Sequence, residues 1–198
     1  MTLRFTTLAF LLALAATPVS AQNSPVANPA AQPSSGIEDG GLTGSVSDEN
    51  EWQDLGIAIT TFATDRDVPT QTNAGSTAQL GQAISQVIAS DLKNNGLFKP
   101  SGPTGLPQPT WPQVQSPDYA GWSGRGANML VQGFVKAGAD GQLTVGCYLY
   151  DVSLTRQLAK GGWQFAASDW RRAAHKCSDL VYARLSGESP FFDSKIAY

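Results

Sequence analysis

Residues 76–96 read STAQLGQAISQVIASDLKNNG, a stretch that carries the start, the buried face and the end of one helix. Ser76 and Gln79 have the Ser-x-x-Gln spacing of a capping box, in which each side chain bonds the other residue's backbone N–H. Asn95-Gly96 supplies a left-handed stop. Apolar residues fall on one face at helical spacing: Leu80, Ala83, Ile84, Val87, Ile88 and Leu92. We therefore predict an amphipathic helix over residues 76–95.

Short strands are predicted on both sides of this helix. Residues 55–62 place Leu55, Ile57 and Ile59 in alternation, which is typical of a half-buried strand. Leu-Phe-Lys at residues 97–99 indicates a second strand, which Pro100 is expected to end.

A proline-rich stretch follows, and residues 101–116 are predicted to be a loop. Ser116 as cap and Pro117 at the first helical position predict a short helix over residues 117–126. Tyr119 and Trp122 are expected to face inward from it.

Three further strands are predicted over residues 129–136, 142–151 and 156–166, with Asp140-Gly141 as the first hairpin turn. A last helix is expected from the Ser168 cap to the Gly187 stop. The order β-α-β-α-β-β-β-α predicts an α/β fold with a mixed sheet of about five strands and packed helices.

Two cysteines lie on apolar faces of these elements. Cys147 shares a strand face with Leu143, Val145 and Leu149, and Cys177 lies on the buried face of the last helix with Trp170, Ala173, Ala174, Leu180 and Val181. A disulfide is favoured in an exported protein, and two buried free thiols are the alternative. His175 is expected to point away from that face, into solvent.

The amino-terminal residues have the pattern of an export signal. Arg4 precedes an apolar run too short to span a bilayer, and small residues precede a cleavage point after Ala21. Residues 1–21 are interpreted as a signal peptide, residues 22–41 as a disordered Pro/Ala/Ser-rich tether, and residues 42–198 as one domain. We expect a periplasmic protein without direct membrane insertion.

Composition and motifs argue against several classes of function. The net charge of −3 gives no basic footprint for nucleic acid. The sequence has one histidine and lacks a Gly-x-Ser-x-Gly elbow, a dinucleotide fingerprint and a Walker-type loop. Two cysteines and one histidine do not make a standard zinc site. We expect no catalytic residues, no cofactor and no metal.

Two weaker candidates remain. Asp65-Arg66-Asp67 has no EF-hand spacing and is interpreted as solvated charge rather than a calcium or paired-carboxylate site. Trp111 and Trp122 could line a sugar-binding surface, but we expect them to belong to local core.

Four stretches together resemble the amino-terminal domain of the TolB family of the Tol-Pal system. They are residues 80–98, residues 117–133, Tyr150-Asp151-Val152 with Gln157-Leu158, and residues 169–198. The resemblance covers most of residues 42–198. It implies the anticodon-binding-domain-like α/β architecture of that domain, which in the family leads into a β-propeller.

The same resemblance implies partners. In the family an amino-terminal strip reaches the inner-membrane protein TolA, and the propeller binds the lipoprotein Pal. Residues 42–50 resemble that strip, so Leu42, Thr43, Val46, Ser47 and Asp48 are the candidate partner-binding residues. A domain strand or tail without a partner is the alternative, and Pal binding is expected only where the propeller is present.

The resemblance thus implies a non-enzymatic periplasmic adaptor that supports outer-membrane integrity and invagination at cell division. Another periplasmic binding module, similar to the activators of penicillin-binding proteins, is the alternative. An enzyme is the third hypothesis, which the absence of catalytic motifs disfavours.

Overall fold

A computed structural model describes residues 55–194 and confirms the predicted α/β fold with a mixed five-stranded sheet. The strands lie in the order β2-β1-β3-β4-β5; β1 pairs in parallel with β2 and β3, and β3-β4-β5 form an antiparallel meander. The elements are β1 (Leu55–Ile59), α1 (Thr77–Asn95), β2 (Phe98–Ser101), η1 (Pro112–Val114), α2 (Tyr119–Ser123), β3 (Met129–Ala137), β4 (Leu143–Asp151), β5 (Arg156–Phe165), η2 (Ala167–Asp169) and α3 (Trp170–Ser186).

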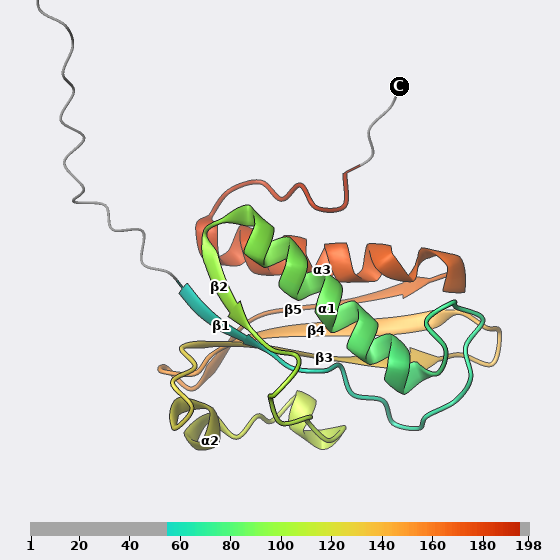
Figure 1. The fold of residues 1–198 in the computed structure, drawn as a ribbon, viewed down its shortest axis with the longest axis horizontal. Helices are drawn as coiled ribbons and strands as arrows, with labels where there is room; N and C mark the ends of the chain where they lie inside the picture. The colour runs from blue at the N-terminus through green and yellow to red at the C-terminus, as the bar shows by residue number, and fades with distance from the viewer. Residues whose placement is uncertain (1–54, 195–198) are drawn as a thin grey trace, which may run out of the picture. The chain divides into compact units, whose positions relative to one another are not determined.

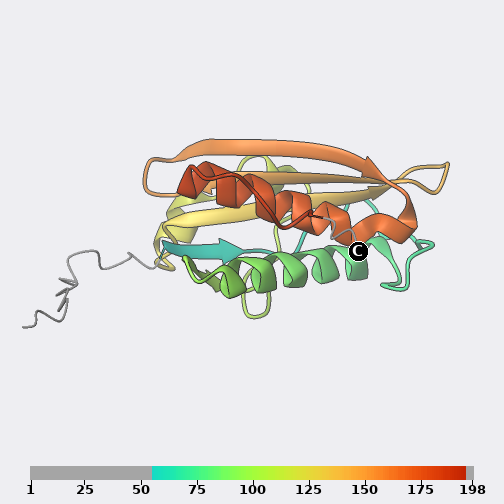
Figure 2. The same cartoon turned by 90° about the horizontal axis from the view of Figure 1, so that it is seen from above.

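The sheet separates two cores. Helices α1 and α3 lie side by side on one face, while α2 and η1 lie on the other (Figures 1 and 2). The larger core lies under α1 and α3 and includes the predicted β4 face. The smaller core joins α2 to β1, β3 and β4 through Ala58, Trp122, Leu130, Tyr150 and Val152.

Helix α1 forms as its capping signals predict. Ser76 accepts from the Gln79 backbone N–H and Gln79 bonds back to Ser76, which completes the capping box. Gly96 ends the helix at φ 84°, a conformation that favours glycine. The carboxylate of Asp67 adds a cap that was not predicted, since its Oδ1 accepts from the Ala78 N–H at 3.0 Å.

The first strand differs from its prediction. β1 ends at Ile59, three residues early, and Ile57, Ala58 and Ile59 are all buried. The reason is its place between two parallel neighbours in a sheet covered on both faces, where a strand has no polar side.

β2 runs through Pro100 to Ser101, so the expectation that Pro100 ends it is wrong. β2 is an edge strand, and an edge strand tolerates a residue without a backbone donor.

Two predicted helix starts and one loop are corrected. α2 begins at Tyr119 with Asp118 as its cap, rather than at Pro117 with Ser116. Ser168 lies inside η2 and does not cap α3, whose first turn has no side-chain cap. The predicted loop over residues 101–116 contains the η1 turn.

Three other predictions for these helices are confirmed. Trp122 is buried, Tyr119 packs beside it, and Gly187 stops α3.

Phe62 joins α1 to the sheet. A Cβ on Gly81 of α1 would overlap the Phe62 carbonyl oxygen, and one on Gly133 of β3 would overlap the Phe62 ring. The Phe62 N–H donates to Ser85 Oγ at 3.1 Å. Glycine is therefore required at two positions so that helix, loop and strand approach this closely.

A substitution at Trp170 tests how α3 packs in the larger core. The side chain is 5% exposed, and its Nε1 donates to Asn73 Oδ1 at 3.2 Å. Trp170→Ala is expected to lower the free energy of unfolding by about 3–5 kcal/mol, measured by urea denaturation, because it removes a large buried side chain. Leu154→Ala, at a residue 59% exposed, is the control and should change stability by less than about 0.5 kcal/mol. Equal effects of the two substitutions would contradict the placement of α3.

Candidate functional site

The predicted partner-binding strip lies outside the described residues. Leu42, Thr43, Val46, Ser47 and Asp48 precede β1, the first described element. β1 itself pairs on both sides, with β2 and β3.

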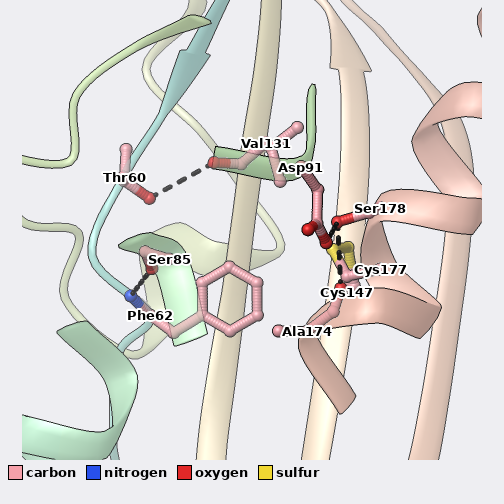
Figure 3. Close-up of a disulfide and its surroundings, with 9 residues drawn as sticks. All are labelled: Thr60, Phe62, Ser85, Asp91, Val131, Cys147, Ala174, Cys177 and Ser178. Atoms are coloured by element: carbon pink, nitrogen blue, oxygen red, sulfur yellow. Dashed lines mark hydrogen bonds between the residues drawn. A yellow bond between two sulfur atoms is a disulfide. The ribbon is translucent and has the colours of Figure 1, made fainter. Parts of the chain in front are cut away.

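A disulfide joins β4 to α3. Cys147 and Cys177 are both fully buried, their Cα atoms are 5.8 Å apart and they are 30 residues apart in the chain (Figure 3). The bond lies near the middle of both elements. It fastens α3 to the sheet at the centre of the larger core.

The single histidine does not point into solvent as expected. His175 Nδ1 lies 2.9 Å from Oδ2 of Asp91 on α1, and Ser178 Oγ donates to the same oxygen at 2.7 Å. Residues 84 and 87 positions apart in sequence thus meet between α1 and α3, a contact that periodicity within one helix does not reveal.

These three residue types occur in hydrolase triads, but their arrangement differs. The hydroxyl of Ser178 donates to the carboxylate and to the Ala174 carbonyl oxygen, whereas a nucleophilic serine bonds the histidine that removes its proton. Ser178 is also fully buried. The cluster holds α1 against α3. Within residues 55–194, no group of three or more His, Cys, Asp and Glu residues could hold a metal ion.

The segment after α3 is folded back along the helix. Arg172 Nε and Lys176 Nζ contact the Asp193 carboxylate at 3.1 and 3.0 Å, and Asp179 accepts from the Phe192 backbone N–H at 2.8 Å. The hydrogen bond from Arg172 holds the pKa of Asp193 below its usual value, and the same bond raises the pKa of Arg172. Local sequence patterns did not predict this Asp193 clasp, because Arg172, Lys176 and Asp193 each read as ordinary surface charge.

Aromatic rings complete this C-terminal contact. Tyr182 on α3 packs edge-on against Phe191 and Phe192 and donates a hydrogen bond to Glu188, which raises the pKa of the phenol. Phe191 remains 48% exposed. Residues 187–194 are thereby fixed to the outer side of α3.

The Asp65-Arg66-Asp67 segment is not merely solvated charge. Asp67 caps α1, and the backbone hydrogen bond from Ala78 lowers the pKa of its carboxyl group. Asp65 pairs with Lys136 of β3 at 3.3 Å. Both acids therefore have structural partners.

The two tryptophans belong mainly to local packing. Trp122 is 6% exposed in the smaller core, as expected, and the Trp111 ring lies 4.9 Å from that of Phe134. Tyr150 is buried next to them and donates to the Val114 carbonyl oxygen at 2.6 Å, and burial raises its pKa. Trp122 is therefore not an open platform for a sugar, whereas Trp111 is half-buried and lines a hollow together with Phe62 and Thr110.

A cavity of about 160 Å³ lies beside Trp122 on the same face of the sheet. Its lining includes Gln132 of β3, which is 1% exposed and whose Oε1 has no hydrogen-bond partner among the described residues. Burying an amide oxygen without a partner costs about 1–3 kcal/mol, so the atom is an unusual feature of this fold. Sequence patterns gave no sign of it.

No helix within residues 55–194 has the length and apolar character of a membrane span.

Comparison with known proteins identifies the family to which the chain belongs. The family described as the TolB amino-terminal domain matches residues 48–158. The chain is 64% identical over 198 residues to Tol-Pal system protein TolB 1 of Novosphingobium aromaticivorans, covering 100% of this chain and 42% of that protein. It is 44% identical over 190 residues to Tol-Pal system protein TolB of Zymomonas mobilis, covering 95% of this chain and 40% of that protein.

A solved structure supports the same fold. The crystal structure of TolB from Acinetobacter baumannii is similar with a TM-score of 0.55 and 26% sequence identity, over 71% of this chain and 30% of that chain. The chain spans about two fifths of the length of the curated relatives it matches.

The disulfide is testable chemically. Denatured, unreduced protein purified from the periplasm is expected to show no free thiol in a reaction with a thiol reagent. Reduction should lower stability by about 3–4 kcal/mol, because the bond closes a loop of 30 residues. Two reactive thiols per chain before reduction would contradict the bond.

The clasp at Asp193 predicts a pH dependence. A carboxyl group whose folded pKa is lowered stabilises the protein above its unfolded pKa of about 3.9, and this stabilisation is lost as the pH falls through the folded value. Asp193→Asn should therefore be less stable than the wild type at pH 7, and the difference should shrink below pH ~4. Urea denaturation from pH 7 to pH 2 measures it.

Arg172→Met, alone and combined with Asp193→Asn, is the matched control. The double variant should lose less unfolding free energy than the two single variants lose together, because the two residues share one interaction. Additive losses, or a difference at pH 2 as large as at pH 7, would show that the clasp does not form.

Proposed function

The chain belongs to the TolB family through its amino-terminal domain, and from that membership we propose that it works as a non-catalytic adaptor of the Tol-Pal system in the periplasm. Its role there is to support outer-membrane integrity and the invagination of the outer membrane at cell division. It does so by contacts with other proteins.

The family match over residues 48–158 is the observation that carries this proposal. The names of the relatives support it, since those proteins are called Tol-Pal system protein TolB. The arrangement of Asp91, His175 and Ser178 supports the non-catalytic part, because the serine bonds the carboxylate and not the histidine.

The partner we propose for the amino-terminal strip is the C-terminal domain of a TolA-like inner-membrane protein. Residues 42–48 are short and polar apart from Leu42 and Val46, so alternate side chains can face a partner while the backbone pairs with an open sheet edge. Thr43, Ser47 and Asp48 provide the polar contacts. Ordering such a segment on binding costs free energy, and the affinity should be modest, on the order of micromolar.

Pal is proposed to bind through a β-propeller, as the family resemblance implies. Residues 1–198 correspond to 42% of the relative from Novosphingobium aromaticivorans and are expected not to bind Pal by themselves. Contacts to TolA and to Pal are thus assigned to different parts of the family architecture.

Two deletions test the strip by calorimetry with the C-terminal domain of TolA. Deletion of residues 22–48 is expected to abolish binding and leave the domain folded, because the described sheet and helices begin at Leu55. Deletion of residues 22–41 alone is the matched control and should bind like the intact chain. Equal affinity of the intact chain and the 22–48 deletion would refute the partner site, and loss of folding in the longer deletion would make the strip structural.

A pull-down from envelope extracts distinguishes the class of adaptor. Recovery of TolA supports the Tol-Pal proposal, whereas recovery of a murein synthase without TolA would favour a module similar to the activators of penicillin-binding proteins.

A further inference from the structure

The hollow at Trp111 has accessible polar walls and no charged side chain in its lining. Its volume is about 330 Å³, and it is lined by the chain after β1, the first turns of α1 and residues 108–111. Gln82, Gln108 and Thr110 are exposed, and Thr61 and Trp111 are half-buried. A ligand in this Trp111 hollow therefore meets side chains that solvent already reaches.

The Trp111 ring is the largest apolar surface of the hollow, and its position is fixed. The centroid of the ring lies 4.9 Å from that of Phe134 on β3. The chain around it is held as well, because the Val114 N–H donates to the Trp111 carbonyl oxygen at 3.3 Å and the Thr110 hydroxyl donates to Gln113 Oε1 at 2.9 Å. An indole held in this way is a preorganised surface for the apolar face of a ligand.

Three polar side chains of the hollow have hydrogen-bonding groups that the domain does not use. The side chains of Thr61, Gln82 and Gln108 bond no residue in the part of the chain that the structure describes. A carboxamide offers donors and an acceptor, and a hydroxyl offers both. The hollow therefore suits a ligand that carries several groups able to donate and to accept.

The start of α1, which borders the hollow, does not serve as an anion site. The first four backbone N–H groups of the helix, at residues 77–80, all donate to described residues, namely Val68, Asp67 and Ser76. A phosphate or carboxylate in the hollow would lose water without gaining a free N–H or a cationic side chain of the lining. The lining therefore favours an uncharged ligand.

The volume indicates the size of that ligand. A cavity of about 150 Å³ holds one benzene molecule, so about 330 Å³ corresponds to roughly 13 heavy atoms. A hexopyranose, with about 12 heavy atoms, and an N-acetylhexosamine, with about 15, are both close to this size. A pyranose also combines an apolar C–H face with several hydroxyl groups that donate and accept.

We propose that the Trp111 hollow binds one uncharged pyranose unit of a glycan. The C–H face of the sugar stacks on the Trp111 ring, and its hydroxyl groups exchange hydrogen bonds with Gln82, Gln108 and Thr61. The site goes beyond the adaptor role proposed above, because it adds a contact with a polysaccharide to the contacts with proteins. It does not depend on the strip over residues 42–48.

Nuclear magnetic resonance on the ¹⁵N-labelled chain over residues 22–198 tests the site. The probes are two uncharged trisaccharides, cellotriose and tri-N-acetylchitotriose, and the control is sorbitol, which has similar hydroxyl groups without a ring to stack. At least one trisaccharide is expected to shift the Trp111 indole N–H and the side-chain amides of Gln82 and Gln108, with a Kd on the order of 1 mM. Sorbitol should not shift them. Tighter binding of tri-N-acetylchitotriose identifies an N-acetylated glycan as the source, and tighter binding of cellotriose an unsubstituted one.

Variants assign the effect to the hollow. Gln82→Met and Gln86→Met are a matched pair, since both side chains are exposed on α1 and only Gln82 lines the hollow. Gln82→Met should weaken binding about 2–10-fold, in the range of a lost hydrogen bond, and Gln86→Met should leave the Kd unchanged. Trp111→Ala should abolish the shifts of both glutamine amides. Trp163→Ala, at another half-buried tryptophan that packs against the larger core, should retain them.

Four outcomes would overturn the proposal. They are equal shifts with sorbitol, no shifts with either trisaccharide, tighter binding of the charged trisaccharide trigalacturonate, or an unchanged Kd in both Gln82→Met and Trp111→Ala. Shifts of the same signals by the C-terminal domain of TolA and by no sugar would make the hollow a protein contact instead.

Discussion

The burial of β1 on both faces is the constraint on which the rest of this structure depends. Ile57 and Ile59 lie in the core beneath α1 and α3, and Ala58 lies in the core beneath α2. Helix α1, from the first half of the chain, therefore covers one face of β1, and the α2 segment, from its middle, covers the other. Helix α3, from the end of the chain, extends the same helical layer over β4 and β5. Phe62, directly after β1, adds the close contacts with Gly81 and Gly133 that hold α1 against β3.

Several side chains that could carry chemistry instead hold these layers together. The two cysteines join β4 to α3, and Ser178 donates to Asp91 beside them (Figure 3). His175 donates to the same carboxylate across the two helices. Asp193 fixes the segment after α3. This distribution supports the non-catalytic role proposed above.

Local sequence signals predicted the elements whose causes are local. The capping box fixed the start of α1, and the alternation Leu143, Val145, Cys147 and Leu149 identified the buried face of β4. The double burial of β1, the His175–Asp91 contact and the unpartnered Oε1 of Gln132 were missed, because each depends on segments distant in sequence. Periodicity describes one element at a time and carries no information on which polar side chains meet. The strip over residues 42–48 remains a prediction that rests on family resemblance.

The central claim is that partner recognition lies in the amino-terminal strip while the disulfide-linked domain serves as its scaffold. Chemical-shift mapping on the labelled intact chain, with unlabelled C-terminal domain of TolA, tests this most directly. The account predicts that signals of residues 42–48 shift or broaden while those of β1, β3 and β4 stay in place. Large shifts across the sheet with the strip signals unchanged would contradict it.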